Sequence, residues 1–200
     1  MLKLTFLLFI SLISCTGASD SHSDESQRDY TSFHNEARQF SKDNKFSDEY
    51  YFLIDMSIHS GKNRFFVYDF KSKKVSASNL VTHGICNVFE NNDTKDEVAR
   101  FSNRDNSHCS SIGKFKVQGR DYSSWGIKVK YWLEGLEPTN NNAKNRVVVL
   151  HSWSAVADAE IYPKYSPLSW GCPAVSDNFM RELDAKLQKT DKPVLLWIIE

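Results

Sequence analysis

Apolar and polar residues alternate along most of the chain after residue 49, which is the pattern of strands with one buried face. Aromatic and β-branched residues dominate these runs and suit a pleated sheet. Short polar turns, one of them around Gly61, separate the runs. The pattern predicts strands over 50–57, 64–70, 75–82, 114–118, 126–133, 146–151 and 193–199, of which the first two form a hairpin.

Helical spacing is confined to two short segments. Phe179, Leu183 and Leu187 predict a helix over 177–188, and a weaker amphipathic pattern predicts a short helix over 31–40. The polar stretch 91–107 has no periodic apolar pattern and is expected to be a loop. We therefore predict a mainly β (α+β) domain, a sheet or sandwich with one or two short packing helices.

The first residues have the form of a secretory signal, because Lys3 precedes an apolar run over 4–12 that is too short for a permanent membrane span. The sequence Leu-Ile-Ser-Cys at 12–15 resembles the lipobox of bacterial lipoproteins. On that resemblance residues 1–14 are a signal peptide, and Cys15 carries the lipid that anchors the exported chain to the envelope membrane, facing the periplasm. The alternative is an ordinary signal with an incidental cysteine.

The rest of the chain divides into a tether and one domain. Residues 15–46 begin with a stretch rich in Ser, Asp and Glu, and we expect a disordered tether apart from the short helix. Residues 47–200 are long enough for a single domain with its own core. The 25 basic residues balance the 25 acidic ones, so the net charge offers no attraction to nucleic acid. We expect a monomer without a nucleic-acid partner.

The most informative chemistry lies between residues 146 and 175. An apolar run at 147–150 ends at His151, and Ser-Trp-Gly-Cys-Pro-Ala-Val follows at 169–175. A histidine at a strand end is held rigidly enough to accept the proton of a thiol, and the thiolate is the attacking species in acyl transfer. Gly171 lets the backbone pass close to a substrate carbonyl, and the N–H groups of Gly171 and Cys172 are candidates for binding an oxyanion. These residues predict Cys172 as nucleophile and His151 as base.

This arrangement resembles the catalytic domain of the L,D-transpeptidases, the YkuD-like family, whose signature is a histidine at a strand end followed by Ser-x-Gly-Cys. The Pro-Ala after the cysteine is similar to the murein L,D-transpeptidase catalytic domain branch, and the resemblance covers roughly residues 50–200. It implies attack on the amide between an L-centre and a D-amino acid in a peptidoglycan stem peptide. The thioester is then resolved by an amine, as transpeptidation, or by water, as carboxypeptidation. The family needs no metal or other cofactor, and we expect none.

Two positions depart from the family pattern, and both bear on the site. Ser152 follows the histidine where glycine is common, and the family orients this imidazole through a backbone carbonyl, which Ser152 retains. The arginine that the larger family places two positions after the cysteine is absent, so another residue, Arg146 or Lys164, is expected to bind a substrate carboxylate.

The remaining expected contacts with substrate come from three other residues. Trp170 either stacks on substrate or packs in the core, and Ser169 lies in the same motif. His83 either lines the groove opposite the nucleophile or caps its strand.

Four cysteines divide into a lipidation site, a nucleophile and one remaining pair. In an oxidising compartment we expect Cys86 and Cys109 to form a disulfide across the long loop. The alternatives are a zinc site that adds His83 and His108, and two free thiols.

Two further functions remain open on this sequence. One is a cysteine hydrolase or peptidase of the cell wall with the same nucleophile. The other is a non-catalytic, peptidoglycan-binding lipoprotein that keeps the fold and has lost turnover, in line with Ser152 and the missing arginine.

Overall fold

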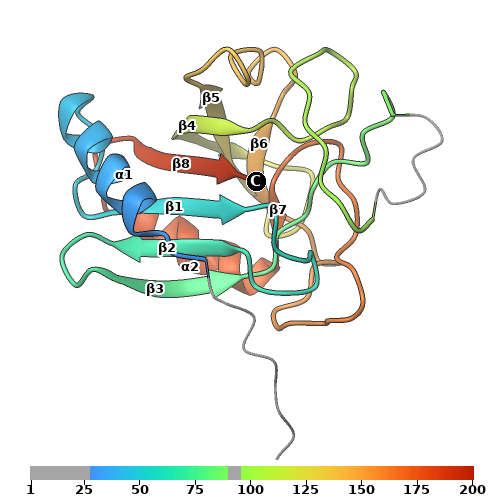
Figure 1. The fold of residues 1–200 in the computed structure, drawn as a ribbon, viewed down its shortest axis with the longest axis horizontal. Coiled ribbons are helices and arrows are strands. Elements are labelled where there is room, and N and C mark those ends of the chain that lie inside the picture. Colours follow the sequence, from blue (N-terminus) through green and yellow to red (C-terminus); the bar gives the residue numbers. More distant parts are fainter. Residues whose placement is uncertain (1–27, 90–95) are drawn as a thin grey trace, which may run out of the picture. The chain divides into compact units, whose positions relative to one another are not determined.

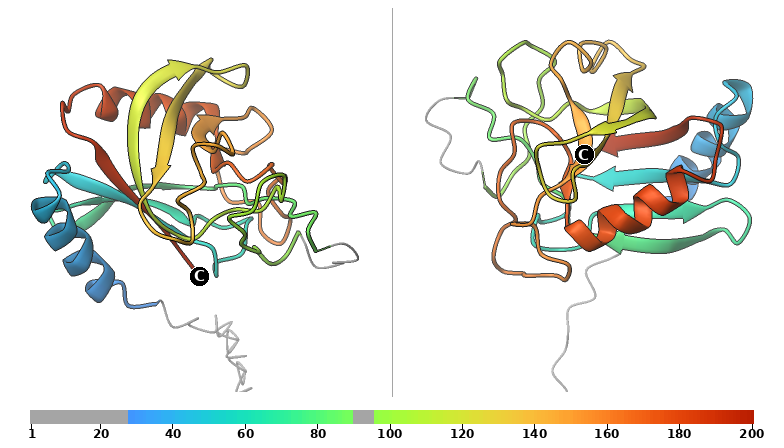
Figure 2. Two further views of the ribbon diagram at one scale, coloured as in Figure 1. Left: turned by 90° about the horizontal axis from the view of Figure 1, so that it is seen from above. Right: turned by 180° about the vertical axis from the view of Figure 1, so that it is seen from behind.

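A single mixed sheet organises the domain in the computed structural model, which describes residues 28–89 and 96–200. The sheet has eight strands in the order β3-β2-β1-β8-β4-β5-β6-β7, and it curls towards a barrel (Figures 1 and 2). The elements are α1 (Thr31–Asp43), β1 (Tyr50–Asp55), β2 (Phe65–Asp69), β3 (Lys74–Asn79), β4 (Gly113–Tyr122), β5 (Val129–Gly135), β6 (Val149–Ser152), β7 (Ala174–Val175), α2 (Asp177–Leu187) and β8 (Val194–Ile199). The predicted mainly β class with two short helices is confirmed.

The central strands β1 and β8 run parallel and are buried at all their positions. Leu196 and Ile198 of β8 join the main hydrophobic cluster, while the alternate residue Trp197 lies on the other face against α1. A strand covered on both faces needs apolar residues throughout, which explains the unbroken apolar sequence at 194–199. The strand predicted at 193–199 and the hairpin of β1 and β2 are both confirmed.

Helix α1 covers the outer face of these strands (Figure 1). Phe33 packs edge-on against Trp197 with ring centroids 5.2 Å apart, and His34 stacks on Tyr68 at 3.6 Å. The helix predicted at 31–40 is therefore real and extends to Asp43, but it belongs to the compact unit that begins at residue 31 rather than to a tether. The sequence pattern missed this because the apolar partners of the helix lie far away along the chain.

Helix α2 closes the opposite face, as the view from behind in Figure 2 shows. Ser176 caps its first turn by accepting a hydrogen bond from the N–H of Phe179 at 3.3 Å. Phe179, Leu183 and Leu187 are all buried in the main cluster, as their spacing predicts. Burial of each such side chain contributes about 1.5–3 kcal/mol, so this helix is fixed mainly by its packing.

The last two strands position the candidate site. The strand predicted at 146–151 begins only at Val149, because Val147 adopts a left-handed conformation (φ 56°) that belongs to a turn. The two-residue strand β7, which the sequence did not reveal, pairs in parallel with β6 and sets His151 opposite Ala174. This register brings the residues just before Ala174 alongside β6.

The predicted signal at 1–14 and Cys15 lie outside the described residues. Within residues 28–89 and 96–200, no helix combines the length and apolar character needed to cross a membrane.

Candidate active site

The turn before β7 is held in place by Ser169. Its hydroxyl donates to the carbonyl of Cys172 at 2.7 Å and accepts from the N–H of Gly171 at 3.2 Å. Gly171 has φ 102°, and a Cβ atom there would lie 2.5 Å from the carbonyl oxygen of Cys109. Glycine is therefore required both by the backbone angle and by the close passage of a second loop. The result is a rigid turn that presents Cys172 to the surface.

Two backbone groups of the segment before and within β6 contact the sulfur of Cys172. The thiol donates to the carbonyl of Val147 at 3.6 Å, and the N–H of Val149 points at the sulfur at 3.5 Å. The residue is partly exposed. Burial of the sulfur among protein atoms raises the pKa of the thiol, and the Val149 N–H and the charges of Arg146 and Lys130 oppose this. The resting state is therefore a neutral thiol with groups around it that favour the thiolate.

His151 is the last but one residue of β6 and is 9% exposed. Its Nδ1 lies 2.9 Å from the carbonyl oxygen of Ser152. Since a carbonyl only accepts, Nδ1 carries the proton and Nε2 is left with a free lone pair. Burial lowers the pKa of His151, the Ser152 carbonyl opposes that shift, and the charge of Lys130 adds to it. The imidazole is thus neutral near pH 7 and ready to accept a proton.

Ser152 has a second contact that holds the neighbouring turn. Its Oγ accepts a hydrogen bond from the N–H of Ile127 at 2.9 Å, in the connection between β4 and β5. The Ser152 backbone therefore orients His151, while the side chain fixes the loop that carries Trp125. Serine in place of the common glycine keeps the carbonyl contact that the family resemblance requires.

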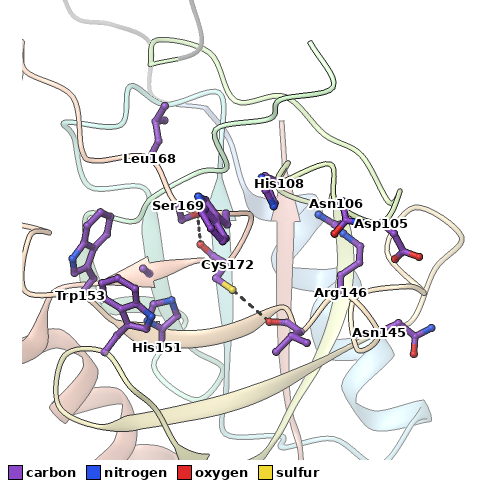
Figure 3. A pocket seen from close by; sticks show the side chains of 14 residues that line it. Asp105, Asn106, His108, Asn145, Arg146, His151, Trp153, Leu168, Ser169 and Cys172 are labelled. Carbon is purple, nitrogen blue, oxygen red and sulfur yellow. Dashed lines mark hydrogen bonds between the residues drawn. The ribbon is translucent and has the colours of Figure 1, made fainter. Parts of the chain in front are cut away.

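A cavity of about 770 Å³ opens at this edge of the sheet, and both Cys172 and His151 line it. Figure 3 shows Cys172 at its centre, with His151 and Trp153 on one side and Arg146 with polar loop residues on the other. On the first side, Trp125 and Trp153 pack edge to face at 5.8 Å. The cavity thus has an aromatic half next to the histidine and a polar half next to the arginine.

Several predicted substrate residues do line this cavity. Ser169 and Arg146 are among them, and so is Trp170, which is 74% exposed and stacks on His108 at 4.6 Å. Trp170 is therefore not a core residue. The hydroxyl of Ser169 is hydrogen-bonded within the turn, so this residue positions the turn as well as lining the cavity.

Two expected contacts are corrected by the structure. His83 is 1% exposed and does not line the cavity; its Nδ1 accepts a hydrogen bond from the guanidinium of buried Arg64 at 3.0 Å. It therefore does not form the wall opposite Cys172. The N–H of Gly171 is buried and already donates to Ser169, so it is not free to bind an oxyanion.

Most of the N–H groups with which Arg146 was expected to bind a substrate carboxylate are already hydrogen-bonded in the structure. Its Nη1 donates to the Ser102 carbonyl at 2.7 Å and to Ser111 Oγ at 2.6 Å, and its Nη2 donates to the Cys109 carbonyl at 2.6 Å. Three of the five guanidinium N–H groups are thus committed to the neighbouring loop. Lys164, the other candidate, is exposed and does not line the cavity.

The loop that binds Arg146 is held by a disulfide between Cys86 and Cys109. The pairing expected from the cysteine count is therefore present, and neither sulfur is a free thiolate ligand for a metal. Across the described positions, no cluster of three or more His, Cys, Asp or Glu side chains is placed to hold a metal ion.

Sequence reasoning missed part of the cavity wall. Trp125, Trp153, Asp105, Asn106 and His108 all line it. Trp153 had a local signal, since it follows the histidine by two positions in the sequence. The others come from the β4–β5 connection and the disulfide loop, and only the tertiary arrangement brings them to the cavity that Cys172 lines.

The chain matches one family profile and is similar to several solved structures. A family profile described as L,D-transpeptidase catalytic domain matches residues 24–196. Similar solved structures include the helical cell shape determining protein Pgp2 of Campylobacter jejuni (11% identity, TM-score 0.45, 78% of this chain and 52% of that one) and Bd1075 of Bdellovibrio bacteriovorus (14%, 0.45, 78% and 49%). An L,D-transpeptidase from Xylanimonas cellulosilytica is also similar (15%, 0.38, 80% and 68%).

The chain spans about half the length of the first two of these proteins. A search of curated proteins found no match. The profile match covers most of the chain, and the protein belongs to the L,D-transpeptidase catalytic domain family.

Proposed function

We propose that the protein is a cysteine acyltransferase that acts on peptidoglycan stem peptides through a thioester on Cys172. The observation that carries this proposal is that Cys172 and His151 both line one open cavity. The imidazole is held with its Nε2 free by the Ser152 carbonyl. Family membership supplies the substrate class, the stem peptide of peptidoglycan.

Acylation begins when Nε2 of His151 accepts the thiol proton and the sulfur attacks the carbonyl of the L-centre. The amide carbonyl becomes an oxyanion, which the N–H of Cys172 is placed to bind. The C–N bond then breaks, and the imidazolium returns its proton to the leaving D-amino acid. A thioester on Cys172 and a neutral His151 remain, so the proton count balances.

Resolution of the thioester uses the same base. An acceptor amine loses a proton to His151 as it attacks, the C–S bond breaks, and the thiolate is reprotonated. Water in place of the amine gives carboxypeptidase trimming. The half of the cavity next to His151 is walled by Trp125 and Trp153, and this apolar lining disfavours water relative to an acceptor with an aliphatic stem. That lining is the reason to favour transfer over hydrolysis.

The test uses purified sacculi treated with the wild-type protein, with Cys172→Ala and with the exposed control Lys164→Ala. We expect new cross-linked or trimmed muropeptides with the wild type and the control, and none with Cys172→Ala. Intact mass spectrometry with a carbapenem, a β-lactam that acylates active-site cysteines, should show an adduct that Cys172→Ala lacks. Sacculus binding by the wild type without any product or adduct would instead select the non-catalytic alternative.

We also propose export and lipid attachment at Cys15, which the lipobox-like sequence at 12–15 supports. Metabolic labelling with an alkyne fatty acid should mark the wild type and not Cys15→Ala. A label that persists in Cys15→Ala would contradict the anchor.

A further inference from the structure

Arg146 is a half-buried cation whose hydrogen-bond partners are all neutral. Its contacts are the carbonyls of Ser102 and Cys109 and the hydroxyl of Ser111, at 2.6–2.7 Å. Within residues 28–89 and 96–200, no carboxylate lies within ion-pairing distance of its guanidinium. Neutral acceptors take three of the N–H groups and do not pair with the charge, while the carboxylate of Asp105 acts on it only from beyond ion-pairing distance.

The guanidinium of Arg146 lies next to the turn that carries Cys172. A Cβ atom built on Gly171 would be 3.3 Å from Nη2 of Arg146, so the guanidinium is in close contact with the residue that precedes Cys172. Arg146 and Cys172 line the same cavity, and Figure 3 shows both side chains among those that line it. In a cavity wall a charge acts on its neighbours more strongly than in water, because the surrounding protein screens it less.

The other charged groups near the sulfur are less suited than Arg146 to stabilise a negative charge on it. Lys130 is already paired with Asp121 at 3.4 Å. His151 is buried and bonded only to a carbonyl, an environment that favours its neutral form. Asp105, on the polar side of the cavity, is exposed, and its Oδ1 accepts a hydrogen bond from an asparagine amide at 2.7 Å.

We propose that Arg146 is a positioning residue for Cys172, held by the disulfide-linked loop so that its guanidinium stabilises the negative charge on Sγ once His151 has taken the thiol proton. The inference rests on the proposed function, because it takes Cys172 as the nucleophile. It gives the three loop contacts a purpose: Ser102, Cys109 and Ser111 fix the cation without neutralising it. The lowered pKa of Arg146, caused by burial and opposed by the charges of Cys172 and Asp105, agrees with this placement.

The experiment measures the rate of iodoacetamide alkylation at Cys172 against pH in the full chain, with the modified peptide identified by mass spectrometry. Arg146→Gln removes the charge and should raise the apparent pKa of the thiol by about one unit. Alkylation at pH 7 should slow roughly threefold, because the greater nucleophilicity of the more basic thiolate offsets part of the loss in thiolate.

Two variants separate charge from hydrogen bonding. Arg146→Lys keeps the charge and loses the planar fork, and Ser111→Ala removes one loop contact and leaves the charge; both should keep the thiol pKa within about 0.3 units of the wild type. An unchanged pH profile in Arg146→Gln overturns the inference. So does a shift of a full unit in Arg146→Lys, which remains decisive even when the glutamine variant does not fold.

Failure of the proposed function gives a different result. In that case the wild type forms no carbapenem adduct at Cys172, whatever its alkylation profile. A reactive wild type with no response to Arg146→Gln refutes only the role of Arg146.

Discussion

Replacement of Gly171 by alanine tests the packing at the centre of the site. The glycine has φ 102°, outside the region that alanine readily adopts, which costs about 1–3 kcal/mol. The new Cβ would also lie 2.5 Å from the Cys109 carbonyl oxygen, a backbone atom held by the disulfide and by Arg146. Relief of such an overlap adds about 1–3 kcal/mol. We therefore expect Gly171→Ala to destabilise the fold by roughly 2–6 kcal/mol.

Gly119→Ala is the matched control. This glycine also has a positive φ (65°), but the nearest atom to its added Cβ is a side-chain carbon of Trp132 at 3.4 Å, an ordinary contact. Its cost should be about 1 kcal/mol, from the left-handed backbone alone. The difference between the two variants isolates the close passage of the loop behind the nucleophile turn.

Thermal unfolding followed by circular dichroism measures this difference. For a domain of this size about 1 kcal/mol corresponds to roughly 2–4 °C, so Gly171→Ala should unfold about 4–24 °C below the wild type and Gly119→Ala about 2–4 °C below it. Gly171→Ala should also lose carbapenem acylation, because the turn that carries Cys172 moves. Equal stability of the two variants would show that the loop does not press on the turn in solution.

Three further outcomes follow from the same contacts. Because burial holds the pKa of His151 below 6.5, the acid limb of the acylation rate should lie below pH 6.5 in stopped-flow measurements, and a limb at higher pH would contradict a neutral resting imidazole. The disulfide joins two cysteines with a sequence separation of 23, so its loss in the double variant Cys86→Ser/Cys109→Ser should lower the free energy of unfolding by about 3 kcal/mol. Urea titrations measure this change, and an unchanged midpoint would refute the stabilising role of the disulfide. Ser152→Ala should cost about 1–3 kcal/mol in the same titration by leaving a loop N–H without its acceptor, yet retain the carbapenem adduct because the carbonyl that orients His151 remains; loss of the adduct would assign the orientation to the hydroxyl.

The strands and the second helix were predictable because their signals are local. The unbroken apolar run of β8 follows from burial on both faces, and the spacing of Phe179, Leu183 and Leu187 follows from a helix with one buried face. Strand ends were less predictable. The apolar run before His151 contains a turn at Val147, where the backbone is left-handed, and a β-branched residue such as valine gives no signal for that conformation. The apolar pattern at 146–151 therefore predicted a strand that begins three residues too early.

The candidate pair Cys172 and His151 was also visible in the sequence, since a strand-ending histidine and a Ser-x-Gly-Cys turn are contiguous motifs. The rest of the wall was not. His83 has the chemistry of a site residue but lies buried against Arg64, while Trp125 comes to the cavity from the β4–β5 connection.

The sequence by itself determined most of the strands and both helices, and it singled out one thiol and one imidazole as the candidate pair, because neighbouring residues encode periodicity and turn geometry. The tertiary structure alone decided that α1 packs on the sheet, that position 171 has no room for a Cβ beside the Cys109 carbonyl, and that Arg146 lines the same cavity as Cys172. These outcomes depend on the order of strands in the sheet and on one disulfide, which bring together segments separated by tens of residues. Such contacts are set by packing and by the competition of buried polar groups for partners, neither of which is written in any single stretch of chain.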